Sequence, residues 1–421
     1  MKPIQSRPPI DATVRIPGSK SITHRALIAA GLAEGPSLLK DALICEDSLH
    51  TVDALRKLGV KITFTGDDAQ VQGTGGRFLP SGRRRKIFLG NSGTSFRLLL
   101  STVALAGGEY LLCGTPRMHE RPIGGLVAAL NRLGVKALYP GKKGYPPVLI
   151  RARGISGGKV VIPGNQSSQF VSSLLLAGPY AGRNMEIEIK GQLVSAPYVD
   201  LTLDVMEHFG VSVAREAYSY FKVPCHKKYR PCRFHVEGDL SSASYFWAAA
   251  AVTGGTVATE NIHSNTSHQG DMRFLEILQK MRCYVKREPQ KVTVSGRSLS
   301  GVDADMGTMP DMVPTLAAIA LFAEGKTVIR NVAHLRFKES DRLTAVAMEW
   351  QRLGGHLEEL PDGLIIHGGQ KLVGTKVDSH DDHRLAMALA VIGLNVPGVE
   401  IKNPGSVIKS FPRFWDLWNT M

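Results

Sequence analysis

Cationic side chains stand where helices are predicted to begin, a position at which helices favour acids and hydroxyls. The stretch PGSKSITHRALIAAGLAEG, residues 17–35, places Lys20, Ser21 and Arg25 at the start of an Ala/Leu/Ile-rich helical run, and Arg384 holds a similar place in DHRLAMALAVIG. A cation there opposes the positive end of the helix dipole, so it costs stability unless an anion lies between it and the backbone N–H groups. These residues therefore predict a site for a phosphate or a carboxylate.

The helices that carry these residues belong to a unit that recurs through the chain. An Ala-rich helix that ends in glycine and precedes a short apolar strand occurs six times, and its glycines are spaced by 73, 74, 73, 70 and 73 residues. These glycines are Gly35, Gly108, Gly182, Gly255, Gly325 and Gly398. A second helix ends in glycine in four units, whereas Arg282 takes that place in a fifth and the C-terminus truncates the sixth. Each unit reads strand, helix, strand, helix, strand, strand, so the sequence predicts an α/β fold of six repeats.

Counting back 15 residues from each glycine gives the predicted starts of the six first helices. In the six repeats this first position holds Lys20, Gly93, Ser167, Leu240, Pro310 and His383. The position after it holds Ser21, Thr94, Ser168, Ser241, Asp311 and Arg384. Hydroxyls, Asp and Pro are common helix caps and first-turn residues, so a purely structural role stays open for each of them. If several of these helix starts point into one cleft, they form a preformed polyanion site.

Composition limits the class of protein. A chain of 421 residues with 43% hydrophobic residues is expected to form two or three globular domains. It has no apolar run long enough to span a membrane, and its N-terminus lacks the apolar core of a signal peptide, which predicts a cytoplasmic protein. The five scattered cysteines are expected to be reduced thiols, because their spacing fits neither a disulfide framework nor a zinc site.

The net charge of +14 predicts an anionic partner. The two dense basic runs, GRRRKI at 82–87 and CHKKYRPCR at 225–233, neither recur along a helix face nor alternate with several aromatic residues. We therefore expect small phosphorylated substrates rather than nucleic acid. No long apolar helix face lies outside the repeats, so the protein is expected to be a monomer.

Ten collinear motifs resemble those of the 5-enolpyruvylshikimate-3-phosphate synthase family. They are PGSKSITHRAL, LGNSGTSFR, PRMHERPIGGL, NQSSQF, LVSAPYVDLTL, GDLSSASYF, PDMVPTLAA, RFKESDRL, DDHRLAMA and KSFPRFW. The resemblance implies a two-domain enolpyruvyl transferase fold, an inside-out α/β barrel with three βαβαββ repeats per domain. One domain would comprise residues 20–236 and the other residues 1–19 and 237–421. Hinges near 18–20 and 236–240 would let them close on a cleft.

The resemblance also implies a reaction and its ligands: transfer of the enolpyruvyl group of phosphoenolpyruvate to the 5-hydroxyl of shikimate 3-phosphate, with no metal or organic cofactor. Shikimate 3-phosphate would be held by Lys20, Ser21, Arg25, Ser167, Ser168, Gln169, Ser195, Tyr198, Asp311 and Lys338. Phosphoenolpyruvate would be held by Lys20, Gly93, Arg121, Gln169, Arg342, His383, Arg384 and Lys409. Guanidinium groups suit both phosphate and carboxylate groups.

Two carboxylates are assigned to proton transfer. Addition to the enol double bond needs a proton delivered to C3 and one removed from the attacking hydroxyl. Elimination of phosphate then removes a proton from C3. We assign Asp311 as the base for the 5-hydroxyl and Glu339 as the group that exchanges the methyl proton, and Lys20 could share the acid role. His334 stands where the family usually has Asn, so its contact with substrate stays open. His380 and His383 lack the regular spacing of metal ligands, so no metal site is predicted.

Two other functions are weighed against this one. The segment AEGKT suggests a phosphate-binding P-loop, but Ala320 replaces the required earlier glycine and a strand follows where a helix is needed. The related UDP-N-acetylglucosamine enolpyruvyl transferase uses a loop cysteine, and the corresponding region, 117–122, has none.

Gly93 also bears on inhibition by glyphosate, which in the family occupies the phosphoenolpyruvate site. A Cβ at this position would shorten the pocket for this longer ligand, so Gly93 predicts a sensitive enzyme. Leu98 stands where sensitive relatives usually have Pro, which is expected to weaken the inhibition without abolishing it.

Overall fold

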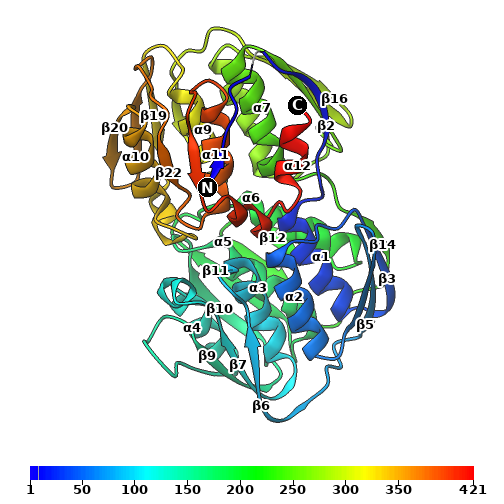
Figure 1. The fold of residues 1–421 in the computed structure, drawn as a ribbon. Helices are drawn as coiled ribbons and strands as arrows, with labels where there is room; N and C mark the ends of the chain where they lie inside the picture. Colours follow the sequence, from blue (N-terminus) through cyan, green and yellow to red (C-terminus); the bar gives the residue numbers. More distant parts are fainter. Residues whose placement is uncertain (8) are drawn as a thin grey trace. The chain divides into compact units, whose positions relative to one another are not determined.

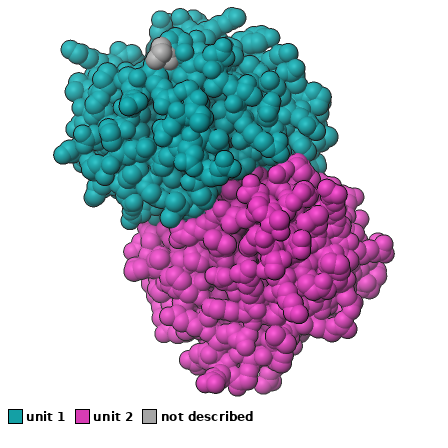
Figure 2. Space-filling view, turned by 45° about the vertical axis from the view of Figure 1, so that its right-hand side comes forward, with its two compact units in different colours: residues 1–17, 237–421 teal, residues 18–236 magenta. Residues whose placement is uncertain are grey.

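The computed structural model describes residues 1–7 and 9–421, and it divides the chain into two compact units (Figure 2). The middle unit comprises residues 18–236, and the terminal unit comprises residues 1–17 and 237–421. Among the described residues each unit holds three small sheets, and these six sheets correspond to the six predicted repeats. The α/β repeat architecture predicted from the glycine spacing is therefore confirmed.

The three sheets of the middle unit share one order, in which a parallel pair is followed by two antiparallel strands. The first sheet has β14 (Arg233–His235), β3 (Glu34–Lys40), β5 (Asp68–Thr74) and β4 (Lys61–Thr65), with helices α1 (Lys20–Leu32) and α2 (Glu46–Lys57). The second has β6 (Ser81–Phe88), β7 (Gly107–Cys113), β9 (Val148–Arg153) and β8 (Lys136–Leu138), with α3 (Gly93–Ala104), the 3-10 helix η1 (Arg117–Glu120) and α4 (Gly124–Arg132). The third has β10 (Gly158–Pro163), β11 (Met185–Lys190), β13 (Tyr220–Val223) and β12 (Ala214–Glu216), with α5 (Ser168–Ala177), η2 (Gly178–Tyr180) and α6 (Pro197–His208).

The terminal unit repeats this plan, except that its last sheet has three strands. The first sheet has β2 (Asp11–Arg15), β15 (Thr256–Glu260), β17 (Lys291–Ser295) and β16 (Tyr284–Glu288), with α7 (Leu240–Thr253), η3 (Gly270–Arg273) and α8 (Phe274–Lys280). The second has β18 (Asp303–Asp305), β19 (Lys326–Arg330), β21 (Gly363–His367) and β20 (His356–Leu360), with η4 (Pro310–Met312), α9 (Val313–Ala320), η5 (Ala333–Phe337) and α10 (Arg342–Arg352). The third has β22 (Lys376–Asp378), β23 (Glu400–Lys402) and β1 (Lys2–Pro3), with α11 (His383–Gly393), η6 (Pro404–Lys409) and α12 (Phe414–Asn419).

Strands near the two crossings of the chain belong to sheets far away in the sequence. β2 directly precedes α1 in the chain, yet it pairs in parallel with β15 of the terminal unit. β14 directly precedes α7, yet it pairs in parallel with β3 of the middle unit. The N-terminal β1 pairs antiparallel with β23, so it supplies a third strand to the repeat that the C-terminus cuts short.

The first helix of each repeat lies at the centre of its unit (Figure 1). α1, α3 and α5 contact one another in the middle unit, as α7, α9 and α11 do in the terminal unit, and nearly all of their residues are buried. They are buried on every side although they include Ser, Thr, His and Arg residues, as expected for helices surrounded by protein. Buried residues alternate with more exposed ones, as in β17 and β4, so one face of each sheet covers the helices and the other lies nearer solvent.

Arg282 keeps the backbone conformation of the glycine that it replaces. Its φ is +75°, in the left-handed region, like that of Gly59, Gly134, Gly210 and Gly354 at the same point of other repeats. The turn geometry is therefore set by the repeat rather than by the residue, at a cost of roughly 1–2 kcal/mol for a residue with a Cβ. Within the described residues, no helix has the length and apolar character that crossing a membrane requires.

Candidate active site

Lys20, the first residue of α1, is held by a buried acid. Its Nζ lies 2.9 Å from Oδ2 of Asp47, which stands in the first turn of α2. Lys20 is 9% exposed and Asp47 is 1% exposed, so the pair lies largely out of water. The carboxylate keeps the ammonium in place at the start of α1, where it can face an incoming anion.

Arg25 is a buried cation held by neutral oxygen atoms. Its Nε donates to Oγ1 of Thr202 at 2.7 Å, and its Nη1 donates to the backbone oxygen of Ser21 at 2.7 Å. Its Nη2 donates to the backbone oxygen of Tyr198 at 3.0 Å and to Oγ of Ser172 at 3.4 Å. Burial lowers its pKa to about 10, so it stays charged at neutral pH. In the part of the chain that the structure describes, no carboxylate compensates this charge, and a buried, uncompensated cation strongly favours binding of an anion.

Gly93 makes room for the guanidinium of Arg121. Arg121 is 3% exposed, and its Nη1 donates to the backbone oxygen of Asn91 at 2.9 Å and to Oδ1 of Asn91 at 3.2 Å. A Cβ added at Gly93 would lie 2.4 Å from Nη2 of Arg121, closer than non-bonded atoms can approach. Glycine at the start of α3 is therefore required for this position of Arg121.

The start of α5 is tied to α3 by Gln169. Its Nε2 donates to Oγ1 of Thr94 at 3.0 Å, and its Oε1 accepts from Nη1 of Arg97 at 2.9 Å. Oγ of Ser167 accepts from the backbone N–H of Gln169 at 3.3 Å, so Ser167 caps α5. These bonds join two of the predicted helix starts in one polar cluster of the middle unit.

Arg342 is the centre of the cluster in the terminal unit. Its guanidinium is 1% exposed and contacts three carboxylates, with distances of 2.8 Å to Asp311, 2.9 Å to Glu339 and 2.7 Å to Asp382. Burial opposes its charge, but the carboxylates of Asp382, Glu339 and Asp311 outweigh burial and raise the pKa of Arg342 well above its ordinary value. The two carboxylates assigned to proton transfer thus share one guanidinium.

Asp311 is surrounded by cations. Its Oδ1 accepts from Nη1 of Arg342 and its Oδ2 accepts from Nη2 of Arg384 at 2.7 Å. Nζ of Lys338 lies 3.8 Å from Oδ1. These contacts place the Asp311 carboxylate among three cations of the terminal unit.

Asp382 fixes the start of α11, which carries His383 and Arg384. Its Oδ1 accepts from the backbone N–H of Arg384 at 2.9 Å, and its Oδ2 accepts from Nε of Arg342 at 2.7 Å. Burial raises the pKa of Asp382, but Arg342 outweighs this effect, so the pKa is lowered overall. His383 is fully buried beside Asp382, and the 3-10 helix η6, which ends at Lys409, contacts α11.

His334 faces the same cluster. Burial and the charge of Lys338 lower its pKa to about 4, with a further contribution from Arg342, while Asp311 acts in the opposite direction. The imidazole is therefore neutral near pH 7. At this position it offers a neutral polar group, as an Asn would, rather than another cation.

Comparisons with known proteins identify the family of the chain. The family model for EPSP synthase (3-phosphoshikimate 1-carboxyvinyltransferase) matches residues 4–418. The chain belongs to the EPSP synthase family. A 3-phosphoshikimate 1-carboxyvinyltransferase from Syntrophobacter fumaroxidans is 46% identical over 98% of this chain and 97% of its own length. One from Nostoc punctiforme is 43% identical over 97% of this chain and 95% of its own. The structure of EPSP synthase from Acinetobacter baumannii has a TM-score of 0.82 and 28% identity, and the match covers 99% of this chain and 97% of that one.

Membership of the EPSP synthase family supports the first of the two enolpyruvyl transferases considered from the sequence. The predicted residues divide between the two units, and the contacts described above join some of them. In the middle unit these are Lys20, Ser21, Arg25, Gly93, Arg121, Ser167, Ser168, Gln169, Ser195 and Tyr198. In the terminal unit they are Asp311, Lys338, Glu339, Arg342, His383, Arg384 and Lys409. Their roles toward substrate in this EPSP synthase family member stay predictions.

The sequence prediction missed several charged residues that position those clusters. Asp47 fixes Lys20, Arg97 fixes Gln169, and Asp382 fixes Arg342. Asp47 stands in the first turn of a helix and Asp382 at a helix N-cap, where acids are common for structural reasons alone, so neither position stood out. His380, which was considered as a metal ligand, lies 2.9 Å from Glu349 instead.

Proposed function

We propose that the protein transfers the enolpyruvyl group of phosphoenolpyruvate to the 5-hydroxyl of shikimate 3-phosphate, giving 5-enolpyruvylshikimate 3-phosphate and phosphate. The family supports the reaction class. The observation that carries the proposal to named residues is that Asp311 and Glu339 both contact the guanidinium of Arg342. A reaction that moves one proton from oxygen and another to carbon needs two such groups close together.

Asp311 acts first on the acceptor. It takes the proton of the 5-hydroxyl as that oxygen bonds to C2 of phosphoenolpyruvate, and C3 gains a proton to become a methyl group. Glu339 exchanges the proton at C3, and it removes one again as the C2–O bond to phosphate breaks and phosphate leaves. Lys20, held by Asp47, can share the acid role. Arg342 stays charged throughout, because the neighbouring carboxylates raise its pKa. Its guanidinium in turn stabilises whichever carboxylate is ionised.

The middle unit supplies the groups that attract the substrate anions. Arg25 is the strongest candidate, because among the described residues its buried charge meets neutral acceptors alone. We assign it to the phosphate and carboxylate of shikimate 3-phosphate, together with the hydroxyls of Ser21, Ser168 and Ser195. Arg121 is assigned to phosphoenolpyruvate, beside the backbone of Gly93.

The proposed reaction uses residues of both units. We therefore propose hinges near 18–20 and 236–240 that bring the substrates into contact with the assigned residues of each unit. Small-angle scattering tests the hinge: adding shikimate 3-phosphate should reduce the radius of gyration, and an unchanged value at saturation would contradict closure. A monomeric state and action in the cytoplasm are likewise proposed, and light scattering after size-exclusion chromatography tests the first.

The reaction itself is tested by measuring phosphate release from phosphoenolpyruvate with two acceptors in parallel. We expect release with shikimate 3-phosphate and none with UDP-N-acetylglucosamine or without an acceptor. Mass spectrometry of the product should show one enolpyruvyl group per shikimate 3-phosphate. Phosphate release with UDP-N-acetylglucosamine but not with shikimate 3-phosphate would refute the proposed acceptor. No phosphate release with either acceptor would refute the proposed reaction.

A further inference from the structure

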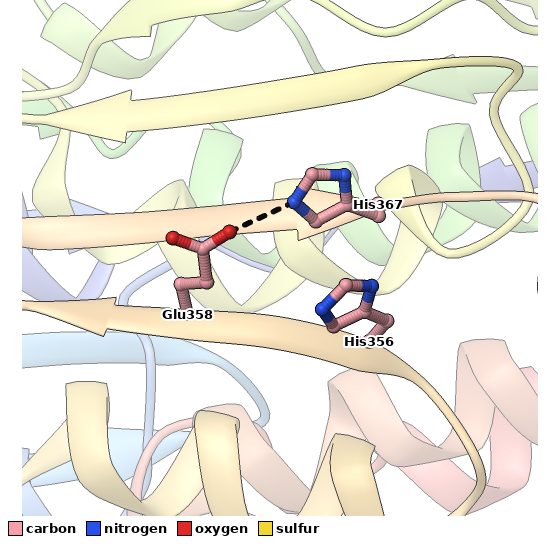
Figure 3. Close-up of side chains that lie close together, drawn as sticks. All are labelled: His356, Glu358 and His367. Carbon is pink, nitrogen blue, oxygen red and sulfur yellow. Dashed lines mark hydrogen bonds and ion pairs between the residues drawn. The ribbon is translucent and has the colours of Figure 1, made fainter.

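Two histidines face each other across neighbouring strands of the terminal unit. His356 begins β20 and His367 ends β21, and the two are paired in the antiparallel register. Their rings stack with centroids 4.5 Å apart and planes 19° apart. Glu358 lies two residues after His356, on the same face of β20, and its Oε1 is 3.0 Å from Nε2 of His367 (Figure 3).

The three side chains present a compact set of ligand atoms. One nitrogen from each imidazole and one oxygen of Glu358 all lie within 4.8 Å of one another. A Zn²⁺ ion binds nitrogen and oxygen ligands at about 2.0–2.2 Å, so ligands of one tetrahedral ion stand roughly 3.3–3.5 Å apart. The contact between His367 and Glu358 is already near this spacing. Because His356 and Glu358 are exposed, small rotations of their side chains can bring the third atom into range.

The ligand types and the charges around the three side chains favour a transition-metal ion over Mg²⁺ or Ca²⁺. Glu358 contributes one negative charge, while Lys326 lies directly opposite His367 on β19 and is exposed on the same face. A hard cation such as Mg²⁺ or Ca²⁺ binds through several oxygen ligands and has little to gain here. Imidazole nitrogen forms coordinate bonds with Zn²⁺, Ni²⁺ and Cu²⁺, and such bonds tolerate a modest positive potential.

We propose that His356, Glu358 and His367 bind a transition-metal ion, with Zn²⁺ as the reference ion and water completing its coordination. The ion joins β20 to β21. Since these residues are outside the catalytic cluster, the site is independent of the proposed function. It links the two strands of the hairpin that follows α10, so bound metal should raise the thermal stability of the protein.

Zinc binding to the full chain is measured by equilibrium dialysis in a phosphate-free buffer. Cys225 and Cys232 are partly exposed thiols, so Cys225→Ser/Cys232→Ser is the background for every variant. We expect one zinc ion with a micromolar dissociation constant, and an increase of that constant by at least ~10-fold in His356→Ala and in His367→Ala. Glu358→Gln should weaken binding less than either histidine variant, because both imidazole ligands remain.

His208→Ala is the matched control. His208 is an exposed histidine beside an acid, Asp204, at 3.5 Å, and within the described part of the chain it belongs to no group of three potential metal ligands. This variant should bind zinc as the background does. A second measurement compares the melting temperature with and without Zn²⁺. Zinc should raise the melting temperature of the background and of His208→Ala, and it should leave that of His356→Ala and His367→Ala unchanged. Zinc binding unchanged in both histidine variants, or no binding in the background at about 1 mM zinc, overturns the proposal.

Discussion

Asp271 is a buried carboxyl next to the proposed base, and replacing it by Asn tests the electrostatics of the terminal unit. Asp271 lies in η3 and is 5% exposed. Its Oδ2 accepts from Oγ of Ser241 at 2.5 Å, whereas its Oδ1 has no hydrogen-bond partner among the described residues. Burial, together with the charge of Asp311, raises its pKa from 3.8 to about 7. The native protein therefore holds a proton on Asp271 that the unfolded chain releases near pH 4.

The sign of the effect follows from proton binding. Between about pH 4 and pH 7 the native state binds more protons than the unfolded state, so this group makes the free energy of unfolding fall as pH rises. Each pKa unit corresponds to ~1.4 kcal/mol, so a shift of about three units costs up to about 4 kcal/mol above pH 7. Asp271→Asn removes the ionisable proton and keeps the shape. Its stability relative to the wild type should rise by about 3 kcal/mol between pH 5 and pH 8.5.

Urea unfolding followed by tryptophan fluorescence at pH 5, 7 and 8.5 measures this difference. At pH 5 the native side chain is mostly protonated but the unfolded chain already releases the proton, so the variant should gain only about one pKa unit of stability, ~1.4 kcal/mol, over the wild type. Asp67→Asn, in an exposed turn, is the control and should show no such trend. If the stabilities of Asp271→Asn and the wild type run parallel across this range, Asp271 is ionised in the native protein and the reasoning from burial is wrong.

Three further predictions concern the proposed reaction, each measured by steady-state phosphate release. Asp311→Ala should lower turnover by a factor on the order of 10² to 10⁴ while shikimate 3-phosphate affinity stays within tenfold, because it removes proton transfer more than binding; near-normal turnover would exclude Asp311 as the base. Arg121→Ala should raise the KM for phosphoenolpyruvate at least ~10-fold, and an unchanged KM would remove Arg121 from that site. Gly93→Ala places a Cβ 2.4 Å from Nη2 of Arg121, so both the KM for phosphoenolpyruvate and the inhibition constant for glyphosate should rise. The inhibition constant should rise more, and equal rises would show that Gly93 does not distinguish the two ligands.

The repeat could be predicted from the sequence because its signal is local. A helix rich in Ala and Leu, a glycine and a short strand recur at a nearly constant spacing, and each copy needs only its own residues to be identified. Arg282 shows the limit of the glycine pattern, since the left-handed conformation persists there without glycine. The length of the pattern was more informative than any single position.

The partners of β1, β2 and β14 could not be predicted from the residues of those strands. Short strands such as Lys2–Pro3 and Arg233–His235 carry too few residues for their pattern to select one sheet. Their pairing is determined by where the chain passes from one unit to the other, which is a property of the whole fold. Only the resemblance to a known family implied that crossing.

The candidate site was predictable in its cations and much less so in the acids that hold them. Lys20 stood out because a cation at a helix start is unfavourable in isolation. Asp47 and Asp271 gave no comparable signal, because an acid in a first turn or beside a glycine fits many surface positions. Their burial depends on packing against a neighbouring helix, Lys20 being 27 residues from Asp47 and Ser241 30 residues from Asp271, and local sequence spacing does not predict it.

The two units differ in how their charges are balanced, and this difference suits the proposed reaction. In the terminal unit three cations face three carboxylates: Lys338, Arg342 and Arg384 against Asp311, Glu339 and Asp382. An anion such as phosphoenolpyruvate that binds the same guanidinium groups competes with those carboxylates and adds negative charge beside them. Added negative charge favours protonation of a neighbouring carboxylate. Under the proposed assignment of phosphoenolpyruvate to Arg342 and Arg384, its binding would promote the protonated state of Glu339, from which the proposed mechanism gives a proton to C3.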